Sequence, residues 1–290
     1  MEGELEMTVM WTLVFFSLFA GLGAGLFVAV VVTEWRNRAE AVRFPAAATA
    51  LAALIVGGIS SVLHLGHPER IFNALNHPTS GIFLEFVFMG LAGLGIVVYM
   101  VMLARGSSDS SRRAEATVTA VPAVVLSFQV GHTYVMASRP AWDTIILPLL
   151  YMATAAVMGC CALSLFAAQK KEVGTTRRAA WATLISLAVE LVLIIAYVAH
   201  LSSAPFADAS RSADRVLSGN LAALFWIGLV LCGLLVPVVL SWLLRSQKAG
   251  WLSPFTSAAI ALAAVLGGGI AFRALMFTLG SGVKQYFGGL

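Results

Sequence analysis

Long apolar stretches alternate with short polar segments along the whole 290-residue chain. A membrane-spanning helix needs about 20 predominantly apolar residues, and eight stretches reach this length. They lie approximately at residues 9–33, 44–65, 82–104, 117–138, 143–168, 179–201, 219–244 and 255–282. Because they leave no room for a soluble domain, the pattern predicts an all-α fold. We expect a polytopic membrane helical bundle of eight transmembrane helices that forms a single domain over residues 1–290.

The composition agrees with a membrane protein. Of the residues, 60% are hydrophobic and 11% are charged, which is roughly half the charged share of a soluble domain, and the mean hydropathy is +0.91. The net charge is +4, but most of the cations lie in short segments between the apolar stretches. This distribution is typical of membrane orientation rather than nucleic-acid binding. We therefore expect membrane lipid, and no nucleic acid, as a partner.

Lys and Arg are divided unequally between the two sets of loops. Twelve of the 18 follow odd-numbered stretches, five lie on the opposite side, and Arg273 lies inside the last stretch. Because cytoplasmic loops carry the excess of Lys and Arg, we expect both termini on the outer (periplasmic) side of a bacterial or archaeal cell (inner) membrane. Glu2, Glu4 and Glu6 stand where a secretory leader carries positive charge, so no cleaved leader is expected.

Two connections on the expected outer side are longer than turns. Residues 66–81 (GHPERIFNALNHPTSG) are predicted to form a short interfacial helix, because their apolar residues fall on one face. Residues from about 202 to 218 (SSAPFADASRSADRVLS) are polar and rich in small residues, which indicates a docking or flexible surface. Loops often carry function, so we expect function on this side.

All five histidines fall in the expected outer half of the protein: His64, His67, His77, His132 and His200. Ionisable side chains in or near membrane spans are costly and are usually functional or paired. Their grouping therefore indicates a proton-active outer surface. The alternative interpretation is that interfacial histidines cost little, because their polar tip reaches water.

The sharpest pairing is that of His64 with Glu85. His64 ends the second stretch, and Glu85 lies about one turn into the third. Two antiparallel helices place such residues at similar depth, so we expect a base and a carboxylate together at the outer edge of the apolar slab. Arg70, Asn73 and Asn76 lie on the connection and are candidates to cover the same pocket. The alternative is that Glu85 only caps its helix, where negative charge favours the helix dipole.

Two further ionisable residues lie deep in predicted spans. Glu190 is near the middle of the sixth stretch, and Arg273 is in the outer third of the eighth. Such depth is expensive, and arginine keeps its charge, so Arg273 needs a carboxylate, carbonyl groups or a polar ligand. Its alternatives are a structural ion pair and a ligand contact. Glu190 is either protonated and silent or part of an internal proton path.

Small and sulfur-containing residues add little chemistry. Gly21, Gly23 and Gly25 allow close helix approach. The three cysteines lie in apolar runs without metal-ligand spacing, so we expect no iron–sulfur cluster in this chain. A b-type haem needs two imidazoles on facing helices. The histidines lack the repeated spacing of multi-haem spans, and a b-type cytochrome stays an alternative that we do not favour.

The segment from His64 to Asn76 (HLGHPERIFNALN), followed by Glu85, resembles the HLGxPxRxFNxLN signature of the DmsC family. The members of this family are the membrane-anchor subunits of dimethyl sulfoxide reductase. The eight-span plan and Arg273 in an aromatic-rich last span are also similar to the family.

The resemblance implies a haem-free anchor subunit in anaerobic respiration that binds and oxidises menaquinol. It also implies two partners, an iron–sulfur electron-transfer subunit and a molybdopterin catalytic subunit on the outer face. His64 and Glu85 take the family's roles in quinol oxidation. Arg70, Asn73, Asn76 and Arg273 are the remaining candidates for quinol contact.

Other functions stay open at this point. The chain is also compatible with the anchor of another molybdenum reductase, for tetrathionate, thiosulfate or an oxyanion, because the choice of substrate resides in another polypeptide. A small-molecule transporter with Glu190 and Arg273 at its midplane is a further alternative.

Overall fold

The computed structural model describes residues 2–64, 78–203, 207–246 and 252–279, and side chains within 11–63, 78–203, 212–246 and 252–279. No strand occurs among these residues. The predicted all-α fold class is therefore confirmed for the described part of the chain.

Eight spans in this part are long and apolar enough to cross a membrane, as predicted. They are α1 (Glu2–Trp35), α2 (Glu40–His64), α3 (Gly81–Ala104), α4 (Asp109–His132), α5 (Ile146–Gln169), α6 (Val173–Ser203), the π-helix η2 (Leu224–Leu235) continued by α8 (Val236–Ser246), and α9 (Pro254–Leu279). A short helix, α7 (Ala207–Leu217), follows α6. The chain is thus a multi-pass membrane protein.

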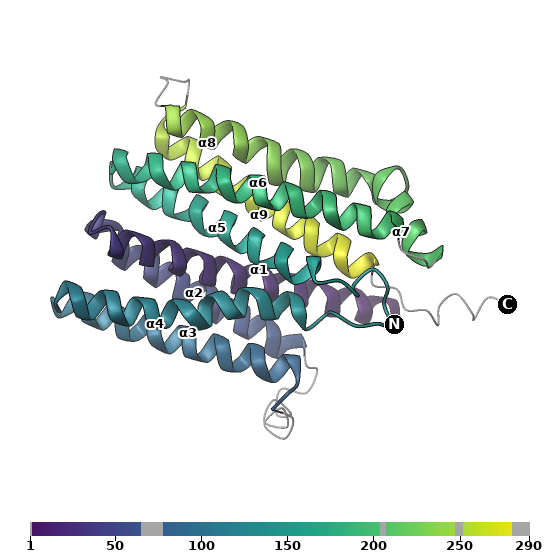
Figure 1. Cartoon of the computed structure of the whole chain (residues 1–290), viewed down its shortest axis with the longest axis horizontal. Coiled ribbons are helices and arrows are strands. Elements are labelled where there is room, and N and C mark those ends of the chain that lie inside the picture. The colour runs from purple at the N-terminus through teal and green to yellow at the C-terminus, as the bar shows by residue number, and fades with distance from the viewer. Residues whose placement is uncertain (1, 65–77, 204–206, 247–251, 280–290) are drawn as a thin grey trace.

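The spans form two neighbouring groups that meet along α1 and α5 (Figure 1). α1 packs on α2 and α4, α5 packs on α6 and α9, and α1 and α5 contact each other extensively. In the most apolar part of each span, 83% of α1 and 72% of α5 is buried, against 17% of α3. The centre of the bundle is therefore α1 and α5, while α3 lies at its periphery.

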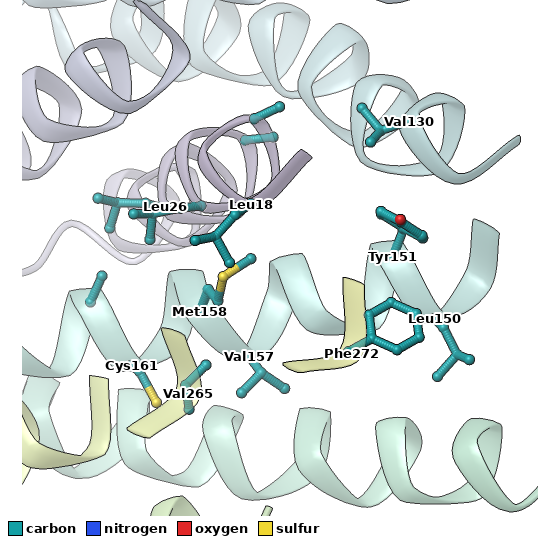
Figure 2. Packing of buried hydrophobic residues seen from close by; sticks show 14 of the residues in the cluster. Leu18, Leu26, Val130, Leu150, Tyr151, Val157, Met158, Cys161, Val265 and Phe272 are labelled. Carbon is teal, nitrogen blue, oxygen red and sulfur yellow. The ribbon is translucent and has the colours of Figure 1, made fainter. Parts of the chain in front are cut away.

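The contact between α1 and α5 depends on small residues. A Cβ atom at Gly25 would clash with the carbonyl of Ala155, and one at Gly159 would clash with the backbone of Gly25. Close approach of this kind is how helices gain packing energy in lipid. It brings Leu18 of α1 and Met158 of α5 into one core cluster (Figure 2).

The fourth span departs from the prediction of 117–138. α4 begins at Asp109, where Ser108 caps it by accepting a hydrogen bond from the Ser111 amide at 3.3 Å. Arg112 enters the helix because its charge is paired with Asp109 at 2.6 Å and with Glu34 at 3.2 Å. Residues 133–145 form turns rather than helix, so the predicted end of this span is wrong.

The two long connections are described to different extents. Residues 207–217 form the helix α7, which packs on α6 and η2. This part of the expected docking or flexible surface is therefore helical. The interfacial helix predicted within 66–81 falls mostly on residues outside the described part. Within it, residues 78–80 form a turn and α3 begins at Gly81.

The bundle has two ends, which we name by the acidic residue buried at each. The Glu85 end holds the last turn of α2 and the first turn of α3, together with residues 133–145. The Glu34 end holds the last turn of α1 and the first turns of α2 and α6. The described start of α1 and the described end of α9 both lie at the Glu85 end (Figure 1).

Candidate functional site: a buried carboxylate at one end of the bundle

Glu85 lies in the second turn of α3 and does not cap that helix. The cap is Ser80, whose Oγ accepts a hydrogen bond from the Phe83 amide at 3.2 Å. The alternative role predicted for Glu85, a helix cap, therefore does not apply. Its carboxylate is therefore not used to cap the helix.

The Glu85 side chain is only 6% exposed, although α3 is the most peripheral span. It is buried because the start of α3 packs tightly against the end of α4: a Cβ atom at Gly81 would lie 2.7 Å from the Thr133 side chain. The Thr133 hydroxyl lies within hydrogen-bonding reach of the carboxylate. The other oxygen, Oε1, is buried and has no hydrogen-bond partner among the described residues. Buried polar groups are nearly always paired. This oxygen can therefore accept a hydrogen bond from a group outside the described residues.

Thr133 is itself held by the last turn of α4. Its hydroxyl donates to the Gln129 carbonyl at 3.0 Å and accepts from Gln129 Nε2 at 3.3 Å. These two contacts fix the position of the hydroxyl beside the Glu85 carboxylate. Sequence reasoning missed Thr133, because the turn at the end of α4 was predicted as helix.

Residues 133–145 close this end of the bundle with aromatic side chains. Trp142 Nε1 donates to the Met276 carbonyl of α9 at 2.8 Å, and Tyr197 of α6 donates to the Ala141 carbonyl at 2.8 Å. Tyr134 packs edge-on against Trp142, with ring centroids 5.5 Å apart. Burial raises the pKa of Tyr134 well above its ordinary value, so the phenol keeps its proton.

The hairpin formed by α2 and α3 brings His64 to the depth of Glu85. The backbone of Gly58 lies against Met89, since a Cβ atom there would be 3.4 Å from the Met89 sulfur. From that contact His64 is six residues toward the end and Glu85 is four. At 1.5 Å per residue, their backbones differ in depth by about 3 Å. The His64 side chain lies outside the described residues, as do Arg70, Asn73 and Asn76, so their contacts with Glu85 stay predictions.

Arg273 lies inside the bundle and is fully buried. Its Nε donates to Ser17 Oγ at 3.0 Å, Nη2 donates to the Ser17 carbonyl at 3.1 Å, and Nη1 donates to the Gly269 carbonyl at 3.0 Å. The guanidinium also lies 5.0 Å from the ring centroid of Tyr151. Carbonyl and hydroxyl groups therefore satisfy much of the need for partners that the sequence indicates. Glu190, which is 5% exposed, is near enough to interact electrostatically with Arg273.

The opposite end holds a second buried carboxylate, which sequence reasoning did not single out. Glu34 is fully buried; it accepts from Tyr99 at 2.7 Å and pairs with Arg43 at 2.9 Å and with Arg112 at 3.2 Å. Two of the twelve cations that follow odd-numbered stretches, Arg43 and Arg112, therefore lie inside helices and are buried rather than in loops. A signal in the sequence could have revealed this cluster. Glu34, Arg43 and Arg112 each lie at the margin of an apolar stretch, and these margins meet at the same end of the bundle.

The remaining histidines differ from one another. His132 ends α4, is exposed and stacks on Phe128 with ring centroids 5.7 Å apart. His200 is half-buried, and its Nε2 lacks a hydrogen-bond partner in the described part of the chain. His67 and His77 lie outside the described residues. Among the residues searched, no group of three or more His, Cys, Asp or Glu side chains could hold a metal ion.

Fold and site together define a class: an integral-membrane helical bundle with a buried carboxylate at one end, one oxygen of which has no partner among the described residues. The chain matches the sequence model of the DMSO reductase anchor subunit (DmsC) over residues 6–279 and therefore belongs to this family. The resemblance noted from the HLGHPERIFNALN segment is thereby confirmed. The protein is also similar to the C subunit of the anaerobic dimethyl sulfoxide reductase of Haemophilus influenzae, with 27% identity over 139 residues, which cover 45% of this protein and 49% of the relative. The match thus spans about half the length of that curated relative.

Proposed function

We propose that this anchor subunit binds and oxidises menaquinol at the Glu85 end. It passes the electrons to an iron–sulfur subunit, which supplies a molybdopterin catalytic subunit of the dimethyl sulfoxide reductase type. The observation that carries the proposal is the Glu85 carboxylate, which is 6% exposed and has one buried oxygen without a partner in the described part of the chain. Membership of the anchor-subunit family supports the choice of partners.

The chemistry needs a proton acceptor beside an apolar surface. Quinol oxidation releases two electrons and two protons, so a group near each reacting hydroxyl must take up a proton as the electrons leave. In this proposal His64 accepts the two hydroxyl protons one after the other and releases the first before it takes the second, because an imidazole titrates near working pH. Glu85 orients the imidazole or takes the proton onward to the exterior water. The electrons pass to the docked iron–sulfur subunit.

The other candidate residues take supporting roles. Arg70, Asn73 and Asn76 shape the mouth of the site from the connection between α2 and α3. Arg273 contributes from behind the site, because its guanidinium is engaged by Ser17 and Gly269 and lies over the Tyr151 ring. It therefore acts as a positioning residue for the Tyr151 ring.

The proposal includes an orientation, with the Glu85 end and both termini facing the outside of the cell membrane. Seven exposed cations support it, because they all lie at the Glu34 end and cytoplasmic loops carry such an excess: Arg36, Arg38, Arg105, Lys170, Lys171, Arg177 and Arg178. Protons and electrons then leave on the same side, so no charge crosses the membrane. Proteoliposomes of the complex should build no potential during quinol oxidation, and a robust inside-negative potential contradicts this arrangement.

The decisive test of the site replaces His64 in the intact complex. We expect His64→Leu to abolish quinol-dependent turnover and to leave turnover with an artificial electron donor intact, because only the first route needs the imidazole. His132→Leu is the matched control: it lies at the same end of the bundle, but it is exposed and stacked on Phe128. Unchanged quinol oxidation in His64→Leu removes this residue from the mechanism.

A further inference from the structure

Two cavities of about 360 Å³ each open side by side at the Glu34 end, on the far side of the bundle from Glu85. The first lies between the end of α1, the last third of α5 and the start of α6. The second lies between the start of α6 and the end of α8. Their arginines are Arg36, Arg38 and Arg178 in the first, and Arg177, Arg178 and Arg245 in the second. Arg178 and Trp181 line both, so the two cavities are neighbours that share part of their wall.

No acidic side chain in the described ranges neutralises the arginines of this site. No ion pair joins any of the five to a carboxylate in the described part of the chain, whereas Arg43 and Arg112 at the same end are paired with Glu34. Arg245 instead lies 4.0 Å from the ring centroid of Trp181. Five guanidinium groups around one opening make a strong anion site.

The loop between α1 and α2 keeps two of these arginines at the opening. Asn37 and Ala39 have φ angles of 51° and 53°, a left-handed conformation that ends α1 within one turn. Arg36 and Arg38 therefore stay in an exposed turn beside the first cavity. The turn therefore holds the two guanidinium groups beside the cavity, whereas a continued α1 would place them elsewhere.

The first cavity also has an apolar depth that a water-soluble anion does not need. Its wall includes Val32, Leu163 and Ile185, and Ile185 lies ten residues beyond Thr175 along α6. At 1.5 Å per residue, the lining descends about 15 Å from the charged opening into the membrane-spanning part of the bundle. An occupant of this shape carries an anionic head and a hydrocarbon tail.

We propose that the two cavities bind an anionic phospholipid of the membrane. The phosphate lies among Arg36, Arg38 and Arg178, and an acyl chain follows the apolar wall. Basic pockets between transmembrane helices recognise lipid headgroups in this way. Since the second cavity offers another cluster of arginines next to the first, a lipid with two phosphates, such as cardiolipin, binds more tightly than phosphatidylglycerol. The site is independent of the proposed quinol chemistry, which lies at the other end.

The test uses Trp181, which lines both cavities, as a reporter. The full-length protein is reconstituted in phosphatidylcholine bilayers and titrated with lipids that carry brominated acyl chains, which quench tryptophan fluorescence on contact. The difference between the native protein and Trp181→Phe isolates the Trp181 signal. We expect saturable quenching by cardiolipin, then by phosphatidylglycerol at a higher mole fraction, and no saturable quenching by brominated phosphatidylcholine.

The triple variant Arg36→Gln, Arg38→Gln, Arg178→Gln should raise the half-saturating mole fraction at least about tenfold, because each arginine near the surface contributes roughly fivefold. The matched control is Arg105→Gln, Lys170→Gln, Lys171→Gln, which removes three exposed charges from the same end without touching either cavity. It should shift the half-saturating mole fraction at least about fivefold less than the triple variant does, since its charges act only through the general surface potential and make no contact with the bound phosphate. If the triple variant fails to insert, Arg178→Gln alone should give a shift of roughly fivefold.

Several outcomes overturn the proposal. Equal losses in the triple variant and its control mean that general surface charge attracts the lipid. No loss in either the triple or the single variant removes the arginines from binding. Displacement of the brominated lipid by inorganic phosphate at a fixed ionic strength shows a phosphate site rather than a lipid site. Equal binding of cardiolipin and phosphatidylglycerol shows that the second cavity does not bind a second phosphate.

Discussion

Glu34 and Glu85 are both buried carboxylates, but they lie at opposite ends of the bundle and in different states of satisfaction. Glu34 receives a tyrosine hydroxyl and two guanidinium groups at 2.7–3.2 Å. Glu85 has Thr133 within reach and one buried oxygen without a partner in the described part. A carboxylate whose partners are all supplied by the protein holds helices together. One left incomplete is available for a ligand or a proton, so the state of pairing distinguishes the two roles better than burial does.

The largest effect on stability is expected from Glu34→Ala. The change leaves Arg43 buried without a carboxylate and Arg112 with Asp109 alone, and breaking a buried ion pair on one side costs about 3–5 kcal/mol. Thermal or denaturant unfolding of the purified protein measures the loss. Glu172→Ala, a half-buried glutamate at the same end without a described ion pair, should change stability by less than about 0.5 kcal/mol. Equal losses in the two variants contradict a structural role for the Glu34 cluster.

Glu85→Gln should give the opposite pattern. The amide keeps the size of the side chain but cannot accept a proton at working pH, so quinol-dependent turnover of the complex should fall about 100-fold or more. Stability should stay within about 1 kcal/mol, because no buried countercharge is left alone. Turnover with quinol and with an artificial donor, together with the unfolding midpoint, measures both. If Glu85→Gln unfolds more easily but oxidises quinol at the native rate, the role of Glu85 is structural rather than catalytic.

A smaller effect is expected from Tyr99→Phe, which removes the hydrogen bond to Glu34 at 2.7 Å. Hydrogen bonds to charged groups contribute about 1.5–3 kcal/mol, and unfolding of the purified protein measures the loss. Combining Tyr99→Phe with Glu34→Ala should add less than the sum of the single changes, since both remove the same contact. Full additivity shows that the hydrogen bond does not belong to the cluster.

The smallest effect is expected at the Glu85 end from Tyr197→Phe. Its hydroxyl donates to the Ala141 carbonyl at 2.8 Å, a neutral acceptor, so the loss should be about 1 kcal/mol. The same unfolding measurement checks it, with quinol turnover as a second reading. A loss as large as that of Tyr99→Phe removes the distinction between the charged cluster and the neutral contacts at the other end.

The sequence predicts what depends on neighbouring residues and fails where distant residues decide. Runs of apolar residues predict eight spans, and the hairpin between the second and third predicts that His64 and Glu85 share a depth. The start of α4 is missed because Arg112 enters the helix only when Glu34, 78 residues earlier, is there to pair with it. Thr133 is missed for the same reason, since its turn is held by side chains from α6 and α9. The contact between His64 and Glu85 stays a prediction.

The π-helix η2 is a further feature that local pattern does not reveal. Its residues form an uninterrupted apolar run that suits an α-helix equally well. Within it Gly233 lies against Gly268 of α9, where a Cβ atom on Gly268 would clash with Gly233. The backbone geometry of this span is therefore fixed by the helix beside it, which the chain supplies later.

The hydrogen bond between Arg273 and Ser17 joins residues 256 positions apart. It therefore constrains the order in which the bundle is assembled during synthesis. Among the described spans, α1 is synthesised before the others and is the most deeply enclosed, yet its contact with α9 forms only after the other spans have been made. Until then, the face of α1 that receives the guanidinium must rest against lipid or the insertion machinery. The bundle is therefore incomplete until α9 has been inserted, and a polypeptide that stops short of α9 leaves Ser17 without its guanidinium partner.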